Sequence, residues 1–145
     1  MSRRKGRILA FQALYSWDVT KPSLDELLTF SWLKKNDDAE EEPVASQKEE
    51  RTFASLIISG TIEHIDEIDS LIESHLSENW SKERLNKVTL AILRTSLYQI
   101  KFQPDANIGI IIDEAVNIAK EYGADDSYKF INAVLDKIGK DEVVK

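Results

Sequence analysis

Apolar residues recur every three or four positions along nearly the whole chain, and this spacing constrains the fold more than any other feature. The spacing puts apolar side chains on one face of an α-helix, whereas a half-buried strand needs alternation at every second residue. No segment alternates for long enough to form a strand. A chain of 145 residues has the size of one domain with a sizeable core. The sequence therefore predicts an all-α fold, a single compact bundle of about seven helices over residues 1–145.

The first two apolar stripes have recognisable boundaries. The first helix is expected to end within Val19–Pro22, because proline cannot continue a helix. Ser23 and Glu26 have the spacing of a capping box, in which the serine oxygen accepts a free amide at a helix start. The stripe of this second helix continues to Trp32.

An acidic segment at about residues 34–47 separates the second stripe from the third. It has few apolar residues, five acids and a proline, so it is expected to be a flexible loop. Ser46 and Glu49 repeat the capping-box spacing and are expected to open the third helix. A fourth stripe follows, and whether a break near His64 separates it from the third remains open.

The broadest stripe runs from Leu85 to Ile100, which predicts a helix at the centre of the core that ends before Pro104. The next helix is expected over residues 108–122. Asn107 is its expected N-cap, and Gly123 stands where a left-handed C-terminal residue is often found.

Asp125 or Asp126 is expected to cap the last helix, because short acidic side chains accept amides at helix starts. Gly139 is expected to close this helix. Its inward-facing residues are predicted to be Phe130, Ile131, Val134, Leu135 and Ile138.

The sequence contains no pattern typical of an enzyme or of a cofactor site. No phosphate-binding or dinucleotide-binding glycine motif can be traced through the five glycines. His64 and His75 would lie roughly 16 Å apart even on one continuous helix, so they cannot share a metal ion. The acid pairs Asp113–Glu114 and Asp125–Asp126 resemble general acid–base pairs, but their position near helix starts explains them more simply. We expect no catalysis and no cofactor.

The absence of cysteine excludes disulfides and thiolate metal sites and is compatible with a reducing compartment. The chain has no run of 18 apolar residues that would span a membrane, and its basic N-terminus lacks the apolar stretch of a secretory signal. The sequence therefore favours a cytoplasmic protein.

Positive charge is concentrated at the N-terminus of an acidic chain with net charge −7. Arg3, Arg4, Lys5 and Arg7 are four of the 19 basic residues, so the remainder holds 15 bases against 26 acids, a balance of −11. This asymmetry indicates a basic arm suited to binding a polyanion, attached to an acidic body suited to binding a basic protein. A solvated helix start is an equally simple reading of the charges alone.

Three segments resemble the NusB family of transcription antitermination factors. The first comprises Arg3, Arg4 and Arg7 with Gln12-Ala13-Leu14-Tyr15-Ser16-Trp17. The second comprises Trp80, Ala91-Ile92-Leu93-Arg94 and Leu97-Tyr98. The third is the most specific and comprises Glu114-Ala115-Val116, Ala119-Lys120, Gly123, Asp126-Ser127, Lys129-Phe130, Asn132 and Val134-Leu135-Asp136-Lys137.

The resemblance implies a seven-helix bundle that binds the boxA element of leader transcripts as single-stranded RNA. It implies a NusE-type small-subunit ribosomal protein as partner, and loading onto the RNA polymerase antitermination complex to promote transcription of ribosomal RNA operons. Self-association, which occurs in some family members, is left open.

The resemblance also indicates RNA-binding residues in the first helix. Arg3, Arg4 and Arg7 match the family's arginine-rich arm, whose guanidinium groups can bind phosphates and stack on bases. Tyr15 matches an aromatic residue near the RNA, although its place in an apolar stripe would equally suit the core.

A second group of matching positions lies around the start of the last helix: Tyr122, Asp126, Ser127 and Phe130. Such a place can bind a single strand through aromatic stacking, acceptor contacts to base edges and free amides for a phosphate. Alternatively, Phe130 fills the core and Asp126 only caps the helix.

Two other functions remain as alternatives. Some RNA cytosine methyltransferases carry a NusB-like accessory module, but no catalytic domain fits within 145 residues. The second alternative is a helical protein–protein adaptor that does not bind RNA.

Overall fold

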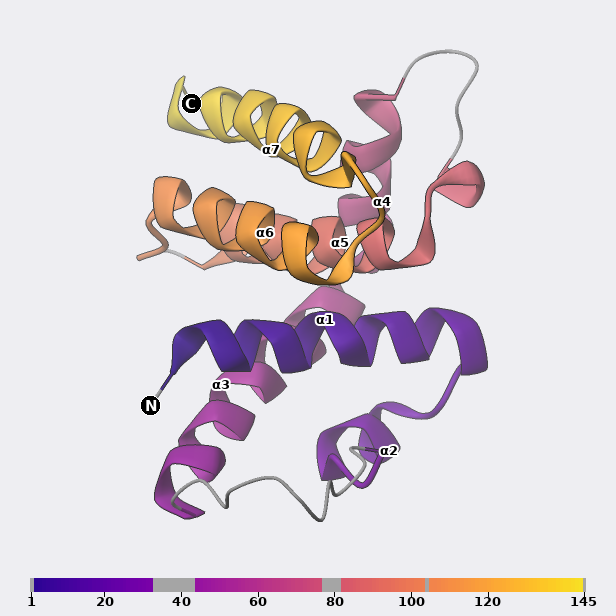
Figure 1. Ribbon diagram of the computed structural model, residues 1–145, viewed down its shortest axis with the longest axis vertical. Helices are drawn as coiled ribbons and strands as arrows, with labels where there is room; N and C mark the ends of the chain where they lie inside the picture. Colours follow the sequence, from indigo (N-terminus) through magenta and orange to yellow (C-terminus); the bar gives the residue numbers. More distant parts are fainter. Residues whose placement is uncertain (1, 33–43, 77–81, 104, 145) are drawn as a thin grey trace.

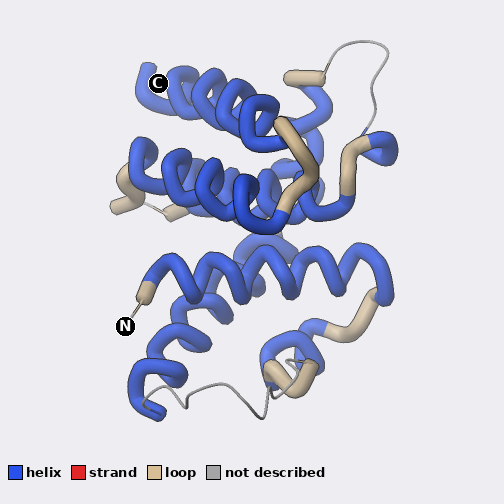
Figure 2. Tube along the Cα trace, in the orientation of Figure 1, coloured by secondary structure: helices blue, strands red, loops and turns tan. Residues whose placement is uncertain are grey.

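The computed structural model describes residues 2–32, 44–76, 82–103 and 105–144. These residues form seven α-helices, one short 3₁₀ helix and no strand, which confirms the all-α prediction (Figure 2). The helices are α1 (Arg3–Thr20), α2 (Leu24–Thr29), α3 (Val44–Glu63), α4 (Ile65–Ser74), α5 (Lys87–Phe102), α6 (Ile108–Tyr122) and α7 (Ser127–Val144), and the 3₁₀ helix is η1 (Lys82–Arg84). No helix in these ranges is both long and apolar enough to cross a membrane.

The α1–α2 boundary lies where proline and the capping box predicted it. α1 ends at Thr20, and the Ser23 side chain accepts the amide of Glu26 at the start of α2. The expected continuation of α2 to Trp32 is wrong, because Phe30 adopts a left-handed conformation with φ 56° and ends the helix. The Trp32 indole instead donates a 2.9 Å hydrogen bond to the carbonyl of Leu27.

α3 begins at Val44, so the expected start at Ser46 is wrong and residues 44–47 of the expected loop are helical. The remainder of that loop, residues 34–43, lies outside the described residues. The break near His64 that the sequence left open is present, since α3 ends at Glu63 and α4 begins at Ile65.

α5 lies at the centre of the fold, as predicted, between two apolar clusters (Figure 1). One cluster combines α5 with α4, α6, α7 and Phe11 of α1. The other combines α1, α2 and α3 with Ala91 of α5. α1 packs against α3 and α5, whereas α6 and α7 pack mainly against each other and α5. α1 therefore contributes to both clusters.

The last two helices agree with the sequence except at the C-terminal end. α6 spans the expected residues, and the Asn107 side chain accepts the amide of Ile110. Gly139 does not close α7, which continues to Val144. A Cβ atom at Gly139 would lie 2.9 Å from Cγ2 of Ile108, so this glycine allows α6 to approach α7 closely.

Candidate nucleic-acid interface

The basic arm is helical, because α1 begins at Arg3. Ser2 caps this helix by accepting the amide of Lys5. Arg3 is exposed, whereas the exposed guanidinium of Arg4 forms an ion pair with Glu121 at the C-terminal end of α6. The hydrogen bond to Glu121 raises the pKa of Arg4. The arm thus already has an anionic partner on the body of the protein.

Arg7 is enclosed by the protein, and its side chain is only 12% exposed. Its Nε donates a 2.8 Å hydrogen bond to Oε1 of Gln99 on α5, and a terminal nitrogen lies 3.6 Å from Oε1 of Glu114 on α6. The guanidinium also lies 5.6 Å from the centre of the Phe53 ring on α3. Burial lowers the pKa of Arg7. This arginine therefore connects α1 to three other helices.

Two exposed tyrosines flank the contact between α1 and α6. Tyr122 is 42% exposed at the end of α6, and its ring centre lies 5.3 Å from that of buried Phe11. Tyr15 follows Phe11 by one helical turn on α1 and is 40% exposed. Both tyrosines are therefore partly accessible to solvent, as stacking on a base requires.

The connection between α6 and α7 has a different backbone geometry from the one expected. Gly123 is not left-handed, because it has φ −89° and ψ 173°. A Cβ atom there would lie 2.5 Å from Oγ of Ser127 and 2.7 Å from the carbonyl oxygen of Ala119, so close packing requires the glycine. The left-handed residue is Asp126, with φ 65°.

Among the described residues, neither Asp125 nor Asp126 accepts an amide through its side chain, so the expected acidic cap of α7 is not formed. The Asp126 carboxylate is exposed and lies 3.5 Å from Nζ of Lys129. The amides of Ser127 and Lys129 donate to backbone carbonyls, so they are not free for a phosphate as the sequence suggested.

Ser127 and Phe130 lie deeper than the other candidate residues. Oγ of Ser127 is buried and has no hydrogen-bond partner among the described residues. Phe130 is half-buried and packs against the cluster built on α5, α6 and α7. The structure therefore places Tyr122 and Asp126 at the surface of this corner, and Ser127 and Phe130 behind it.

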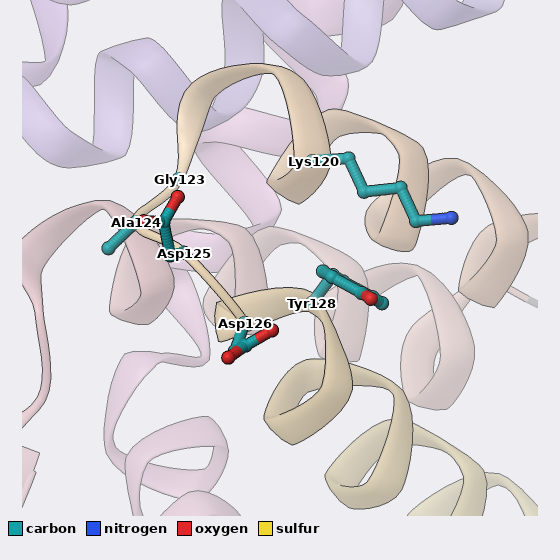
Figure 3. A pocket seen from close by; sticks show the side chains of 6 residues that line it. All are labelled: Lys120, Gly123, Ala124, Asp125, Asp126 and Tyr128. Carbon is teal, nitrogen blue, oxygen red and sulfur yellow. The ribbon is translucent and has the colours of Figure 1, made fainter.

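A shallow depression at the same corner contains residues that the sequence analysis did not identify as candidates (Figure 3). Its lining residues are Lys120, Gly123, Ala124, Asp125, Asp126 and Tyr128. The ammonium of Lys120 lies 4.9 Å from the centre of the Tyr128 ring, and that of Lys129 lies 6.0 Å from it. Lys120 and Lys129 belong to the third NusB-like segment. Their presence in that segment is the sequence feature that could have identified a site with basic and aromatic side chains at this corner.

The two histidines and Glu114, considered above as metal-binding or acid–base groups, contact other side chains of the protein. The His64 ring stacks on Phe102, with 3.9 Å between the ring centres, and Nε2 of His75 lies 3.8 Å from the Asp141 carboxylate. Glu114, from the first acid pair, contacts Arg7. No group of three or more histidine or acidic side chains in the described ranges is arranged to hold a metal ion.

Comparison with known proteins identifies the family. A family model described as the NusB family matches residues 4–140. The chain is 51% identical over 138 residues to the transcription antitermination protein NusB of Treponema denticola, and this match covers 95% of this chain and 96% of the relative.

A solved structure of T. maritima NusB matches with a TM-score of 0.80 and 35% identity, covering 97% of this chain and 92% of that one. A crystal structure of the antitermination factors NusB and NusE in complex with double-stranded RNA matches with a TM-score of 0.77 and 29% identity, covering 95% and 96% of the two chains. The family resemblance is therefore confirmed, and this chain belongs to the NusB family.

Proposed function

We propose that this chain is a transcription antitermination factor that acts as one RNA-binding domain in the cytoplasm and catalyses no reaction. It binds boxA-type single-stranded RNA together with a NusE-type small-subunit ribosomal protein. The complex joins RNA polymerase and promotes processive transcription of ribosomal RNA operons. The observation that carries this proposal is the family match across residues 4–140, which includes the α6–α7 corner and the helical arm except Arg3.

The geometry supports an RNA path from the start of α1 to the start of α7. Arg3 and Arg4 are exposed and can bind phosphates, and Tyr15 and Tyr122 offer exposed rings for base stacking. The exposed carboxylate of Asp126 can accept hydrogen bonds from base edges. Figure 1 shows α1 running beside α6, so these groups come from neighbouring elements.

Arg7, Ser127 and Phe130 contribute to the same interface from behind the surface. Arg7 holds the first turns of α1 against α5 and α6 through Gln99 and Glu114. Phe130 supports the α6–α7 corner through its contacts with the core. Ser127 packs beneath Gly123, and its buried hydroxyl has no hydrogen-bond partner among the described residues.

Electrophoretic mobility shift with a boxA-like single strand tests the proposal. A scrambled strand of the same length and a duplex of the same sequence serve as controls, the latter because the related NusB–NusE complex contains double-stranded RNA. We expect the boxA-like strand to bind more tightly than both. Absence of binding to any RNA would favour a protein–protein adaptor, and equal binding to the duplex would contradict single-strand recognition.

Replacing Tyr122 by leucine is expected to weaken RNA binding by about 1–3 kcal/mol, because a stacking ring is lost while most of the apolar packing remains. The dependence of affinity on salt should stay nearly unchanged, since stacking releases no counterions. Fluorescence anisotropy titrations at several salt concentrations measure both quantities.

Leu56→Ala on α3 is the matched control for the tyrosine variant, because Leu56 is 62% exposed and lies outside the proposed path. It should leave RNA affinity unchanged. Phe130→Leu should weaken RNA binding only to the extent that it disturbs the corner, and its unfolding must be measured in parallel because Phe130 packs against the core. Unchanged RNA affinity for Tyr122→Leu would remove this residue from the interface.

A further inference from the structure

Glu121 occupies the place at Arg4 that an RNA phosphate would take. Its carboxylate is the partner of the Arg4 guanidinium, and the pair joins the first turn of α1 to the last turn of α6. The neighbouring residue along α6 is Tyr122, which contacts Phe11 on α1. A strand that stacked on Tyr122 and placed a phosphate on Arg4 would therefore meet the Glu121 carboxylate at the same position.

We propose that Glu121 is a specificity-determining residue that competes with RNA phosphates for Arg4. This inference rests on the proposed RNA-binding function and deepens it. In the free protein the carboxylate neutralises Arg4, and RNA must displace it before the guanidinium can bind a phosphate. A single weakly held anion gains little from this exchange, whereas a strand that also binds Arg3 and stacks on the tyrosines can drive it.

The exposure of the Arg4–Glu121 pair makes such an exchange feasible. The side chain of Arg4 is 43% exposed and that of Glu121 is 49% exposed, so water and salt can reach both groups. An exposed ion pair is weak because solvent screens it and two long side chains lose freedom when it forms. A phosphate can therefore replace the carboxylate without exposing a buried charge.

Arg7 provides the contrast within the same helix. Its guanidinium is fixed by Gln99 and Glu114 and is only 12% exposed, so release of its partners would disturb the packing of α1. The two arginines thus have different roles: Arg7 positions the arm, and Arg4 is the exchangeable group that Glu121 controls.

Removing the competing charge is expected to strengthen RNA binding. Glu121→Gln should tighten binding of a boxA-like single strand by about two- to fivefold, the range expected for loss of one exposed ion pair. The slope of log affinity against log salt should become steeper by up to about 0.7. In the wild-type protein, the displaced Glu121 carboxylate takes up cations and so offsets the counterion release at Arg4, whereas a glutamine takes up none.

Asp113→Asn is the matched control, since Asp113 is an exposed acid on α6 and the change alters net charge by the same amount. Arg4→Ala and the Arg4→Ala, Glu121→Gln double variant complete the set. Tighter binding by Glu121→Gln than by Asp113→Asn, with no gain in the Arg4→Ala background, is the expected result.

Equal effects of the two neutralising changes, weaker binding by Glu121→Gln, or a gain that persists without Arg4 would overturn the inference. Failure of the wild-type chain to bind RNA would overturn the proposed function and this inference with it, whereas RNA binding that requires Arg4 but is insensitive to Glu121 would overturn the inference alone.

Discussion

Replacing Asp69 by asparagine is expected to lower the free energy of unfolding by about 3–5 kcal/mol, because it leaves a buried arginine without its hydrogen-bonded counter-charge. The Asp69 carboxylate accepts two hydrogen bonds from Arg94, each 2.9 Å long, and the two residues are 7% and 5% exposed. These bonds join α4 to α5. A second carboxylate, that of Asp18 on α1, lies 3.7 Å from Arg94 but accepts no hydrogen bond from it. Urea unfolding followed by circular dichroism measures the loss.

Two control variants separate the buried charge from other causes. Asp136→Asn removes an exposed acid that lies 3.1 Å from Lys140, and it should cost less than about 1 kcal/mol. The Asp69→Leu, Arg94→Met double variant replaces both charges by apolar groups and should recover much of the stability lost by Asp69→Asn. A loss below about 1 kcal/mol for Asp69→Asn would contradict the role of this pair.

Replacing Arg3 and Arg4 by alanine together is expected to weaken binding of single-stranded RNA by up to about 25-fold at 0.1 M salt. Each phosphate contact to a single strand contributes about 0.7 to the slope of log affinity against log salt. Two contacts therefore account for a slope of at most about 1.4, or about 25-fold between 1 M and 0.1 M salt. The loss should be similar for any strand sequence, because phosphates carry no sequence information.

Lys137→Ala combined with Lys140→Ala is the matched control, since both lysines are exposed on α7 and the charge change is identical. This control should retain most of the affinity and the full salt slope. An unchanged slope for the arginine variant, or an equal loss for the lysine variant, would show that the arm does not contact phosphates specifically. The Arg4 contribution should appear smaller than that of Arg3, because RNA must displace Glu121 from Arg4.

Local patterns predicted most of the fold. The capping interactions of Ser23 and Asn107 are formed as expected, because each joins groups only three residues apart. Periodicity also identified α5 as the central helix, since a helix surrounded by others has a broad apolar face. The candidate positions from the NusB resemblance lie on neighbouring elements, with Tyr15 and Tyr122 exposed rather than in the core.

The features that could not be predicted depend on residues far apart in the sequence or on backbone conformation. The pairing of Arg4 with Glu121 spans 117 positions, that of Arg7 with Gln99 spans 92, and no local pattern indicates either. Gly123 was expected to be left-handed because a glycine after a helix commonly is. Here close packing against Ser127 requires this glycine, and Asp126 is the left-handed residue instead. Gly139 was misread for the same reason, since it serves the α6–α7 contact within a continuing helix.

Thermodynamic coupling between RNA and the partner protein tests the central proposal most directly. The affinity of a boxA-like single strand is measured with and without a saturating basic ribosomal protein of the NusE type, and the affinity of that protein is measured with and without RNA. The acidic body, with net charge −7 for the whole chain, is expected to bind the basic partner, and each ligand should raise the affinity of the other by the same factor. Identical RNA affinities with and without the partner would contradict cooperative loading of RNA by this protein.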